Sequence, residues 1–400
     1  MKKAIIYIAA VFVVIALAAA AYFYWRIWPG LKPAIGPRPK VTSQTVKPIP
    51  GAVNTTGLPL TIPAGFKIEL FTAGLGMVRF MAFDEQGTLI ATITDGGNVV
   101  ALPDVDKNGR ADQTVTCLTG LDNPHGLVFH KGFLYIAETE RLAKYSYQTS
   151  RPGVIAVGSG VPVASLPGGG GHYTRTVTFG PDDNIYVAAG SSTNNNPEID
   201  RRRAAITRYN EDGSGEQVFA TGLRNSVGLV WHPVTQELWA TDNGRDNLGD
   251  DLPPDEINIV KQGGDYGWPY AYDNRIPDPM YDDAAKAAGS LLPKIEIQAH
   301  SAPLGLRFFT GNAWGAGYKN DLFVAYHGSW NRSVPTGYKV VRYDLTGPSY
   351  DQVGQQSDFI TGWLTPDGAL GRPVDIIQGP DNSLYISDDK SGSIYKVTKM

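Results

Sequence analysis

The 400-residue chain contains 46 glycines and 28 prolines, which occupy more than one position in six and exclude a long helical bundle. Hydrophobic residues make up 42% of the chain and charged residues 18%, which is typical of a globular protein with a large core. The net charge of −4 and the scattered basic residues predict no nucleic-acid partner. Cys117 is the single cysteine, so an internal disulfide, a C-x-x-C-H haem site and iron–sulfur ligation are excluded, and any redox chemistry needs an organic cofactor.

An uncharged apolar segment, residues 4–25, follows Lys2 and Lys3 at the N-terminus. As a helix that rises about 1.5 Å per residue, this segment covers about 33 Å and is long enough to cross a bilayer core. The two lysines favour a cytoplasmic N-terminus, and aromatic residues cluster where the far interface should lie. We therefore predict a signal anchor over residues 1–28, with the rest of the chain on the periplasmic or extracellular side.

Two other interpretations of this segment are a cleaved signal peptide and a buried helix of a soluble domain. Small residues at 18–20 or 19–21 offer a peptidase site, but the apolar run is long and ends in bulky aromatics. A soluble amphipathic helix would show an apolar stripe, and none is present. The proline-rich residues 29–62 are predicted to form an extended tether, and residues 63–400 the main domain.

The main domain repeats one pattern six times: an apolar strand, a polar turn, a strand of alternating aromatic and aliphatic residues, and a turn into a third strand. The six units contain MAFDEQGTLIATITDGGNVVAL, GLVFHKGFLYIAETERLAKYSY, VTFGPDDNIYVAAGSS, GLVWHPVTQELWATDNG, GLRFFTG with DLFVAYHG, and VDIIQGPDNSLYISDDKSGSIYKV. Each unit is too small to bury both faces alone, so a period near 50 residues predicts an all-β, six-bladed β-propeller. A β-sandwich has similar strands but would not repeat the block so often. The early strand FKIELFTAG is expected to complete the last blade and close the ring.

Two histidines stand at the entrances of predicted inner strands. His172 follows four glycines in a row, which allow a ligand to approach the backbone closely, and its ordinary pKa suits a general base at neutral pH. The alternative is a hydrogen-bonded histidine in a flexible loop. His125, in the sequence Asn-Pro-His-Gly-Leu, occupies a similar place one unit earlier and is a candidate substrate contact.

Charged and polar residues gather on the turns of the later units. Arg224 and Asn225 precede the fourth unit and suit a ligand rich in carbonyl or carboxylate oxygens. The acidic turn 242–251 offers oxygen ligands for a hard cation such as Ca²⁺. Arg332 and Arg372 would add positive charge for an anionic ligand, although surface arginines need no special role.

A second candidate cation site lies in the first unit. Asp104, Asp106, Asn108 and Asp112 occupy positions 1, 3, 5 and 9 of a loop with glycine at position 6, which is the spacing of a calcium loop. The loop has Val115 where the bidentate glutamate of such loops stands. A structural Ca²⁺ site and a plain Asx-rich turn are both compatible with this pattern.

Several of these blocks together resemble the glucose/sorbosone dehydrogenase family of quinoproteins, from about Pro63 to Met400. The strongest block is TGLRNSVGLVWHP with ELWATDNGRDNLGDDLPPDEINIVKQGGDYGWP, supported by GGGGHYTRTVTFGPDDNIYVAAGSS, HGSWNRSVPTGYKVVRYDL and GRPVDIIQGPDNSLYI. The resemblance implies a six-bladed propeller that binds pyrroloquinoline quinone (PQQ) with Ca²⁺ and oxidises a sugar hydroxyl.

The resemblance also implies roles for individual residues. By it, His172 is the general base, Arg224 and Asn225 contact the quinone oxygens, and Arg372 engages the cofactor. Arg332 lies near a lysine position of the glucose enzyme, and the backbone carbonyls of Gly244 and Arg245 fall where the calcium of the cofactor is held.

The chain departs from the glucose enzyme at three places. Ser191 stands for an aspartate partner of the histidine, Val227 for a glutamine and Val374 for a second arginine. These changes resemble the sorbosone and pyranose branch and argue against glucose as the substrate. Without the aspartate, Tyr173 or Ser191 is expected to serve beside His172 at the substrate site.

The leading hypothesis is a membrane-tethered, PQQ- and Ca²⁺-dependent dehydrogenase of aldoses or related sugar alcohols and aldehydes. Since the chain carries no haem site, its electrons must pass to an external acceptor such as a quinone or a cytochrome. Two alternatives stay open: a calcium-dependent hydrolase, such as a lactonase with His172 as base toward water, and a non-catalytic propeller that binds carbohydrate or protein.

Overall fold

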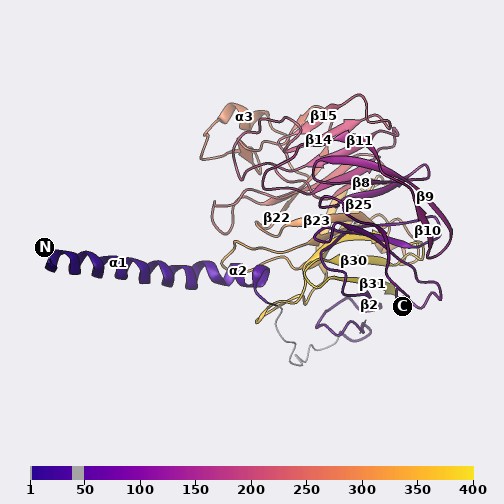
Figure 1. The fold of residues 1–400 in the computed structure, drawn as a ribbon, viewed down its shortest axis with the longest axis horizontal. Helices are drawn as coiled ribbons and strands as arrows, with labels where there is room; N and C mark the ends of the chain where they lie inside the picture. Colours follow the sequence, from indigo (N-terminus) through magenta and orange to yellow (C-terminus); the bar gives the residue numbers. More distant parts are fainter. Residues whose placement is uncertain (1, 38–48) are drawn as a thin grey trace.

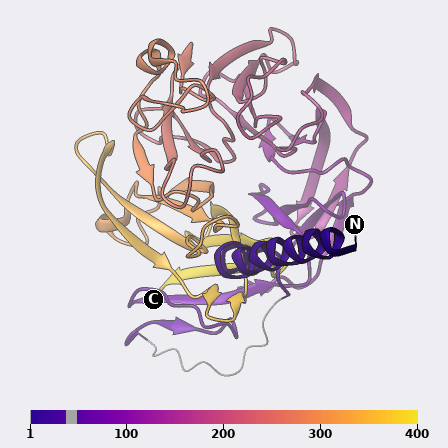
Figure 2. The ribbon, with the colours of Figure 1, turned by 90° about the vertical axis from the view of Figure 1, so that its left-hand side faces the viewer.

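The computed structural model describes residues 2–37 and 49–400 as a β-propeller with a projecting helix (Figure 1). Within these residues, six mainly antiparallel sheets are arranged in a ring around a central axis. Figure 2 shows this ring face-on. The first strand of each sheet contacts the first strands of both neighbouring sheets, so the six inner strands form a closed ring. The predicted six-bladed propeller is therefore confirmed.

The blades follow the chain, each from its inner strand outward. Blade 1 comprises β3 (Val78–Phe83), β4 (Leu89–Ile93), β5 (Asn98–Leu102) and β6 (Val115–Leu118). Blade 2 comprises β7 (Leu127–His130), β8 (Phe133–Ala137), β9 (Arg141–Arg151) and β11 (Val161–Ser165), and β10 (Val154–Val157) also pairs with β9. Blade 3 comprises β12 (Arg175–Phe179), β13 (Ile185–Ala189), β14 (Ala205–Tyr209), β15 (Gln217–Thr221) and β19 (Gly264–Asp265).

Blade 4 comprises β16 (Leu229–Trp231), β17 (Leu238–Asp242), β18 (Asp255–Val260) and β22 (Ile295–Ile297). Blade 5 comprises β23 (Pro303–Phe308), β24 (Leu322–Tyr326), β25 (Lys339–Thr346) and β26 (Gln352–Ile360). Blade 6 comprises β29 (Pro373–Gln378), β30 (Leu384–Asp388), β31 (Ser393–Lys399), β2 (Phe66–Thr72) and β1 (Val53–Asn54). Short insertions add β20 (Ala271–Tyr272), β21 (Ile276–Pro277), α3 (Ala284–Gly289), η2 (Ala316–Tyr318), β27 (Leu364–Thr365) and β28 (Gly368–Ala369).

The core lies between the faces of adjacent blades. The second strands β4, β13, β17, β24 and β30 are buried at every residue, as expected for strands covered on both faces. Between blades 4 and 5, for example, Trp239 packs edge-on against Phe308, with ring centroids 5.4 Å apart. Aromatic side chains of the repeated strands thus fill space between neighbouring blades.

The ring closes through residues from both ends of the domain. Strand β2 pairs antiparallel with the C-terminal strand β31, with Phe66 opposite Lys399 and Ile68 opposite Val397. The prediction that the early strand completes the last blade is confirmed. Closure in this way joins the N-terminal and C-terminal strands of the propeller within one sheet.

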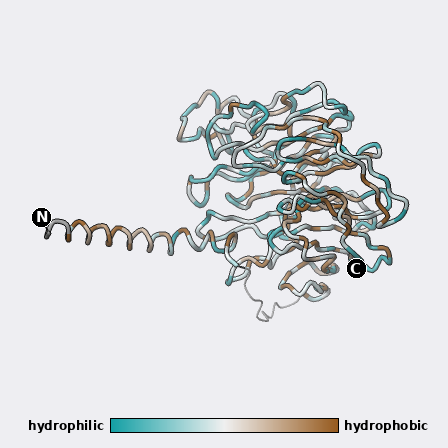
Figure 3. The backbone as a smooth tube through the Cα atoms, in the orientation of Figure 1, coloured by the Kyte–Doolittle hydropathy of each residue, from teal (hydrophilic) through white to brown (hydrophobic). Residues whose placement is uncertain are grey.

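The N-terminal helix is continuous and longer than predicted. It comprises α1 (Lys2–Tyr22), the π-helical turn η1 (Phe23–Ile27) and α2 (Trp28–Ile35). The run Ile6–Ile35 is apolar and long enough to cross a membrane, and Figure 3 shows α1 as largely hydrophobic. Nothing in the described chain buries the apolar window of this run.

Residues 29–62, predicted as an extended tether, are helical at their N-terminal end. The helix continues to Ile35, with Pro29 in the first turn of α2 and Pro33 inside it. Near the other end, Leu60 and Ile62 are buried in the same core cluster as Trp363. Residues 38–48 lie outside the described residues.

Candidate functional site

A polar cavity of about 130 Å³ lies among loops of blades 3, 4 and 5. Its lining residues stand on connections that enter a first strand or leave a second strand, apart from Asp255, which begins the third strand of blade 4. The others are His172, Arg224, Asn225, Asn243, Gly244, Asp246, His300, Ala302, Trp330 and Asn331. In an up-and-down blade both kinds of connection lie on the same face of the ring. The cavity therefore lies on the face of the ring that carries these connections, which we call the loop face. Helix α2 lies on the same face, because this helix contacts Arg332 and Lys390 in the loops after β24 and β30.

His172 is held by Ser191, the residue that replaces the expected aspartate. Nδ1 of His172 lies 2.9 Å from the Ser191 carbonyl oxygen and 3.1 Å from Ser191 Oγ. The Ser191 hydroxyl donates its own proton to the carbonyl of Thr193 at 2.6 Å. The carbonyl oxygen and Oγ of Ser191 therefore both act as acceptors toward Nδ1 of His172. We infer that Nδ1 carries the proton, which leaves the lone pair on Nε2.

The imidazole of His172 is also kept neutral. Burial, and after it the positive charge of Arg224, lower its pKa to about 4. Nε2 bonds to no group within residues 2–37 and 49–400. At neutral pH the site therefore presents an unprotonated, oriented base to a ligand.

Gly190 makes the close packing around this histidine possible. A Cβ atom at Gly190 would lie 2.7 Å from the Cβ of His172 and 2.3 Å from Oδ1 of Asn225. Both distances are shorter than real Cβ contacts, so a residue with a side chain would displace one of the two neighbours. Sequence reasoning missed Gly190, because nothing in the pattern distinguishes it from glycines of ordinary turns.

Arg224 organises the loops around the cavity with all five of its guanidinium N–H groups. It donates to the carbonyl of Asn194, to the carbonyls of Asn243 and Gly244, to the side chain of Asn194, and to Asp246 at 3.0 Å. Its side chain is only 6% exposed. Arg224 thus contributes positive charge to the cavity wall, and a direct bond to a ligand would replace one of these existing bonds.

The amide of Asn225 is free for a ligand. Its backbone N–H donates to Oδ1 of Asp242 at 2.6 Å, and its carbonyl accepts from the Asn243 side chain at 3.0 Å. Its side-chain amide bonds to no other group among the described residues, although the residue lines the cavity. Asn225 is therefore positioned through its backbone and unoccupied at its side chain.

Two buried carboxylates support these loops from behind. Asp242 accepts from the backbone N–H groups of Arg224 and Asn225, and Asp255 accepts from those of Gly244 and Ala302. Burial raises the pKa of each to about 7. Asp242 was predicted as part of a cation-binding turn, but it faces backbone donors instead.

A repeated signal in the sequence marks this type of support. In four units a carboxylate at or just after the end of the second strand accepts from a backbone N–H of the loop that enters the same blade; these residues are Asp95, Glu138, Asp242 and Asp388. Comparison of the six units at this place would have indicated that Asp242 has a structural task.

The oxygen atoms around Gly244 suit a hard cation. The carbonyls of Asn243 and Gly244 and the carboxylate of Asp246 converge on the Arg224 guanidinium at one wall of the cavity. Asp246 also accepts from the Asn331 side chain at 2.6 Å and so connects the loops of blades 4 and 5. The Arg245 side chain turns away and pairs with Asp278 at 2.8 Å, so that residue can serve the cavity only through its backbone. Such a set of oxygens is the kind that Ca²⁺ prefers.

Two predicted site residues lie outside the cavity. His125 is completely buried, with Nδ1 3.1 Å from the carbonyl of Arg175, and does not line this cavity. Arg332 donates to the carbonyl of Asp250 and pairs with Asp251, and its side chain points away from the neighbouring Asn331 that does line the cavity. The structure therefore gives no support to Arg332 as a cofactor contact.

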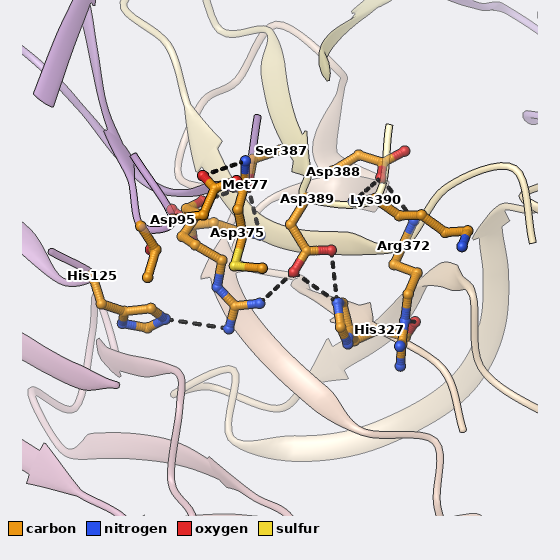
Figure 4. A network of polar contacts seen from close by, with 12 residues as sticks. Met77, Asp95, His125, His327, Arg372, Asp375, Ser387, Asp388, Asp389 and Lys390 are labelled. Carbon is orange, nitrogen blue, oxygen red and sulfur yellow. Dashed lines mark hydrogen bonds and ion pairs between the residues drawn. The ribbon is translucent and has the colours of Figure 1, made fainter. Parts of the chain in front are cut away.

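Tyr173 and Arg372 border the site without lining the cavity. Tyr173 is 40% exposed beside His172, which is compatible with a contact to a substrate that enters from solvent. Arg372 donates to the carbonyls of His327 and Gly328, and Figure 4 shows it beside His327 and Asp389. The backbone N–H of His327 donates to the carbonyl of Ala302, so this network adjoins the cavity.

The network in Figure 4 crosses the inner ends of several blades. Asp389 accepts from Arg79 at 2.6 Å and faces Nε2 of His327 at 2.9 Å, and Arg79 lies 3.4 Å from Nε2 of His125. His125 is therefore part of a buried polar network that joins loops of blades 2, 5 and 6 to Arg79 of blade 1. His125 precedes the inner strand β7, as predicted, but its side chain contacts Arg79 and the Arg175 carbonyl and does not line the cavity.

The predicted calcium loop brings its carboxylates together. Ligand atoms of Asp104, Asp106 and Asp112 all lie within 4.8 Å of one another. Asn108 donates to Asp106 within the loop, and one oxygen of Asp104 is buried without a hydrogen-bond partner. The arrangement is that of an Asx-rich turn with room for a cation.

A six-bladed propeller with an oriented histidine, an arginine and an oxygen-lined pocket on its loop face defines a class of ligand-binding and catalytic propellers. The family model for glucose/sorbosone dehydrogenase matches residues 163–396, which is more than half of the chain. The chain belongs to the glucose/sorbosone dehydrogenase family.

The sequence relatives of this chain differ in how much of it they match. An uncharacterised protein of Borreliella burgdorferi is 31% identical over 84% of this chain and 90% of its own length. A pyrroloquinoline quinone-dependent pyranose dehydrogenase of Coprinopsis cinerea is 25% identical over 85% of this chain, but the match spans only 55% of that enzyme. An aldose sugar dehydrogenase of Escherichia coli is 24% identical over 57% of this chain.

Solved structures agree on the fold. A Trichoderma reesei enzyme of carbohydrate-active family AA12 superposes with a TM-score of 0.76 at 21% identity, over 86% of this chain and 99% of the other. The holo form of the PQQ domain of the Coprinopsis cinerea enzyme gives 0.75, over 87% and 99%. At this identity the agreement establishes the six-bladed propeller alone.

Proposed function

We propose that this protein oxidises a sugar hydroxyl or sugar aldehyde of the aldose or sorbosone type, with PQQ and Ca²⁺ as cofactors. In this proposal α1 anchors the chain in a membrane, the propeller lies on the periplasmic or extracellular side, and the electrons pass to an external acceptor. The family supports oxidation of a sugar, and the relatives in Coprinopsis cinerea, a PQQ-dependent pyranose dehydrogenase, and in Escherichia coli, an aldose sugar dehydrogenase, support PQQ and an aldose.

One observation carries the proposal. His172 is neutral, is oriented through Nδ1 by Ser191, and shares its cavity with the unoccupied amide of Asn225 and the charge of Arg224. A base of this kind removes the proton of a hydroxyl group at neutral pH without first having to lose its own.

Each residue then has a distinct task. Nε2 of His172 accepts the hydroxyl proton of the sugar, while Asn225, Arg224 and Arg372 offer donors and positive charge to the oxygens of the cofactor. When bound, PQQ would accept the hydride from the sugar carbon. The carbonyls of Gly244 and Arg245, with the carboxylate of Asp246, would hold the Ca²⁺ ion.

The substrate preference follows from the replacement of the aspartate. Ser191 orients His172 through its carbonyl and hydroxyl and adds no negative charge beside the base. The part of the wall beside the base is therefore polar without a charge of its own, which suits neutral sugars and related aldehydes. We also propose that Asp104, Asp106, Asn108 and Asp112 hold a structural Ca²⁺ apart from the cavity.

The experiment that tests this function compares the unmodified chain with His172→Ala in two assays. PQQ binding is followed by absorbance titration with Ca²⁺ present, and turnover by reduction of a dye with a panel of aldoses and sorbosone. We expect His172→Ala to bind PQQ with near-normal affinity and to lose at least 10²-fold in kcat, the lower end of what a general base contributes. A variant that turns over at a near-normal rate would remove His172 from the role of base.

A further inference from the structure

A groove of about 580 Å³ separates the N-terminal helix from the loops of the propeller. We call it the helix groove; Tyr24, Trp25 and Trp28 line it from the helix, and Val334, Pro335 and Leu364 from the propeller. Its volume falls within the range of about 300–1,000 Å³ of small-molecule sites. Figures 1 and 2 show the helix leaving the loop face of the ring at this place.

The helix groove combines aromatic faces with a single cation. Tyr24 and Trp25 pack edge to face, with ring centroids 5.8 Å apart, and both are more than half exposed. Lys32 is the one charged side chain among the described residues that line the groove. A planar ring with polar oxygens matches such a lining, because its faces stack on aromatic side chains and its oxygens accept from an ammonium group.

The groove has a fixed position because α2 is docked on the propeller. Gly30 and Pro33 are buried, and a Cβ at Gly30 would lie 2.1 Å from the carbonyl oxygen of Arg332. Lys390 donates to the carbonyls at the end of α2, 3.1 Å from that of Gly36. The last turn of the predicted membrane helix therefore rests directly on the loop after β24.

That same loop also forms a wall of the candidate site. Trp330 and Asn331 line the polar cavity, and Val334 and Pro335 line the helix groove. Three peptide units separate Asn331 from Val334, so their Cα atoms lie no more than about 11 Å apart. The two sites are thus close neighbours on the loop face.

We propose that the helix groove binds the ring of a membrane quinone, which serves as the electron acceptor of the sugar oxidation. This inference rests on the proposed function. In the overall reaction a C–H and an O–H bond of the sugar break and a C=O bond forms, which releases two electrons and two protons. The membrane quinone takes up both electrons and both protons, and its two C=O groups become C–OH.

The position of the groove favours a quinone over a lipid tail. Aromatic residues mark the level where the helix leaves the bilayer, so a lipid-soluble oxidant reaches the groove without leaving the membrane. An acyl chain would gain apolar contact with the aromatic side chains but nothing from Lys32, whereas a quinone ring can use both. The single cysteine also leaves the chain without a covalent haem or a cysteine-ligated cluster to carry the electrons further.

The first test measures binding without catalysis, with the full chain in phosphatidylcholine nanodiscs and a decyl-substituted benzoquinone as the probe. Quenching of tryptophan fluorescence should saturate. Val334→Arg should raise the dissociation constant at least tenfold, because it places a charge in the apolar wall beside Lys32. The matched control is Val234→Arg, at another exposed valine remote from the groove. Equal quenching in the two variants, or quenching that does not saturate, would overturn the proposal.

The second test measures quinone and dye reduction by the same nanodiscs with PQQ, Ca²⁺ and the sugar. Val334→Arg should lower the ratio of quinone to dye reduction at least tenfold relative to Val234→Arg, and Trp28→Leu should raise the KM for the quinone severalfold. Dye reduction without quinone reduction would overturn the proposed acceptor and leave the sugar oxidation intact. Failure of the unmodified chain to reduce dye would refute the proposed function, and the quenching titration would still decide whether the groove binds quinone.

Discussion

Gly190 is the position where one added methyl group should damage the candidate site most directly. A Cβ at this residue would lie 2.7 Å from the Cβ of His172, whereas ordinary contacts begin at 3.4 Å. Relief of the overlap moves His172 by about 0.7 Å, or moves Asn225, whose Oδ1 would lie at 2.3 Å. Overpacking of this kind costs about 1–3 kcal/mol of stability. Because a misplacement of about 1 Å in a site costs up to about 10²-fold in rate, we expect Gly190→Ala to lower kcat/KM by 10- to 100-fold.

The assay for this prediction is dye reduction with PQQ and Ca²⁺ in excess, with thermal unfolding measured on the same samples. Gly289→Ala is the matched control, because a Cβ at that glycine meets no atom within 4 Å. The control should keep the rate and melting temperature of the unmodified chain. A Gly190→Ala variant that folds and turns over at the normal rate would refute the reasoning that links this glycine to the position of His172.

Three further predictions follow from the site. Since the pKa of His172 is lowered to about 4, kcat/KM should rise as the pH increases through about 4 and stay level from pH 6 to 8; a limb centred near 6.5 would contradict a neutral, buried base. Arg224→Leu removes a positive charge that lowers this pKa, so the limb should move toward higher pH and PQQ affinity should fall; an unmoved limb in the pH profile would show that the charge is not felt. Chelation of Ca²⁺ should lower the melting temperature, and Asp104→Asn should reduce that effect; equal melting with and without Ca²⁺ would leave the loop as a plain turn.

The fold was predictable because the repeat carries it. Six copies of one strand pattern define six blades. The early strand in residues 66–74 has no partner within the repeat, so it is expected to pair with the last strand of the ring, as it does. The tether was mispredicted because proline content was taken as a sign of extended chain. Pro29 is tolerated in a first helical turn, and Leu60 is recruited into the core by neighbours that the local sequence does not reveal.

The candidate site was predictable at the level of loops and less so at the level of side chains. His172, Arg224, Asn225 and Gly244 come together because each stands at a strand end on the loop face. His125 stands at an equivalent place, yet its ring turns inward to Arg79 and the carbonyl of Arg175.

Arg332 likewise turns to Asp251, although Asn331 beside it lines the cavity. The position of a residue before a strand predicts the loop on which it lies. The direction of its side chain depends on neighbours from other blades, which the local sequence does not specify.

The most direct test of the central claim is dye reduction by the purified full chain in detergent, with and without added PQQ and Ca²⁺, across aldoses, sugar alcohols and sorbosone. The account predicts turnover of at least one sugar that requires PQQ, is strengthened by Ca²⁺ and is lost in His172→Ala. No turnover with any sugar, together with no PQQ binding by absorbance titration, would contradict it.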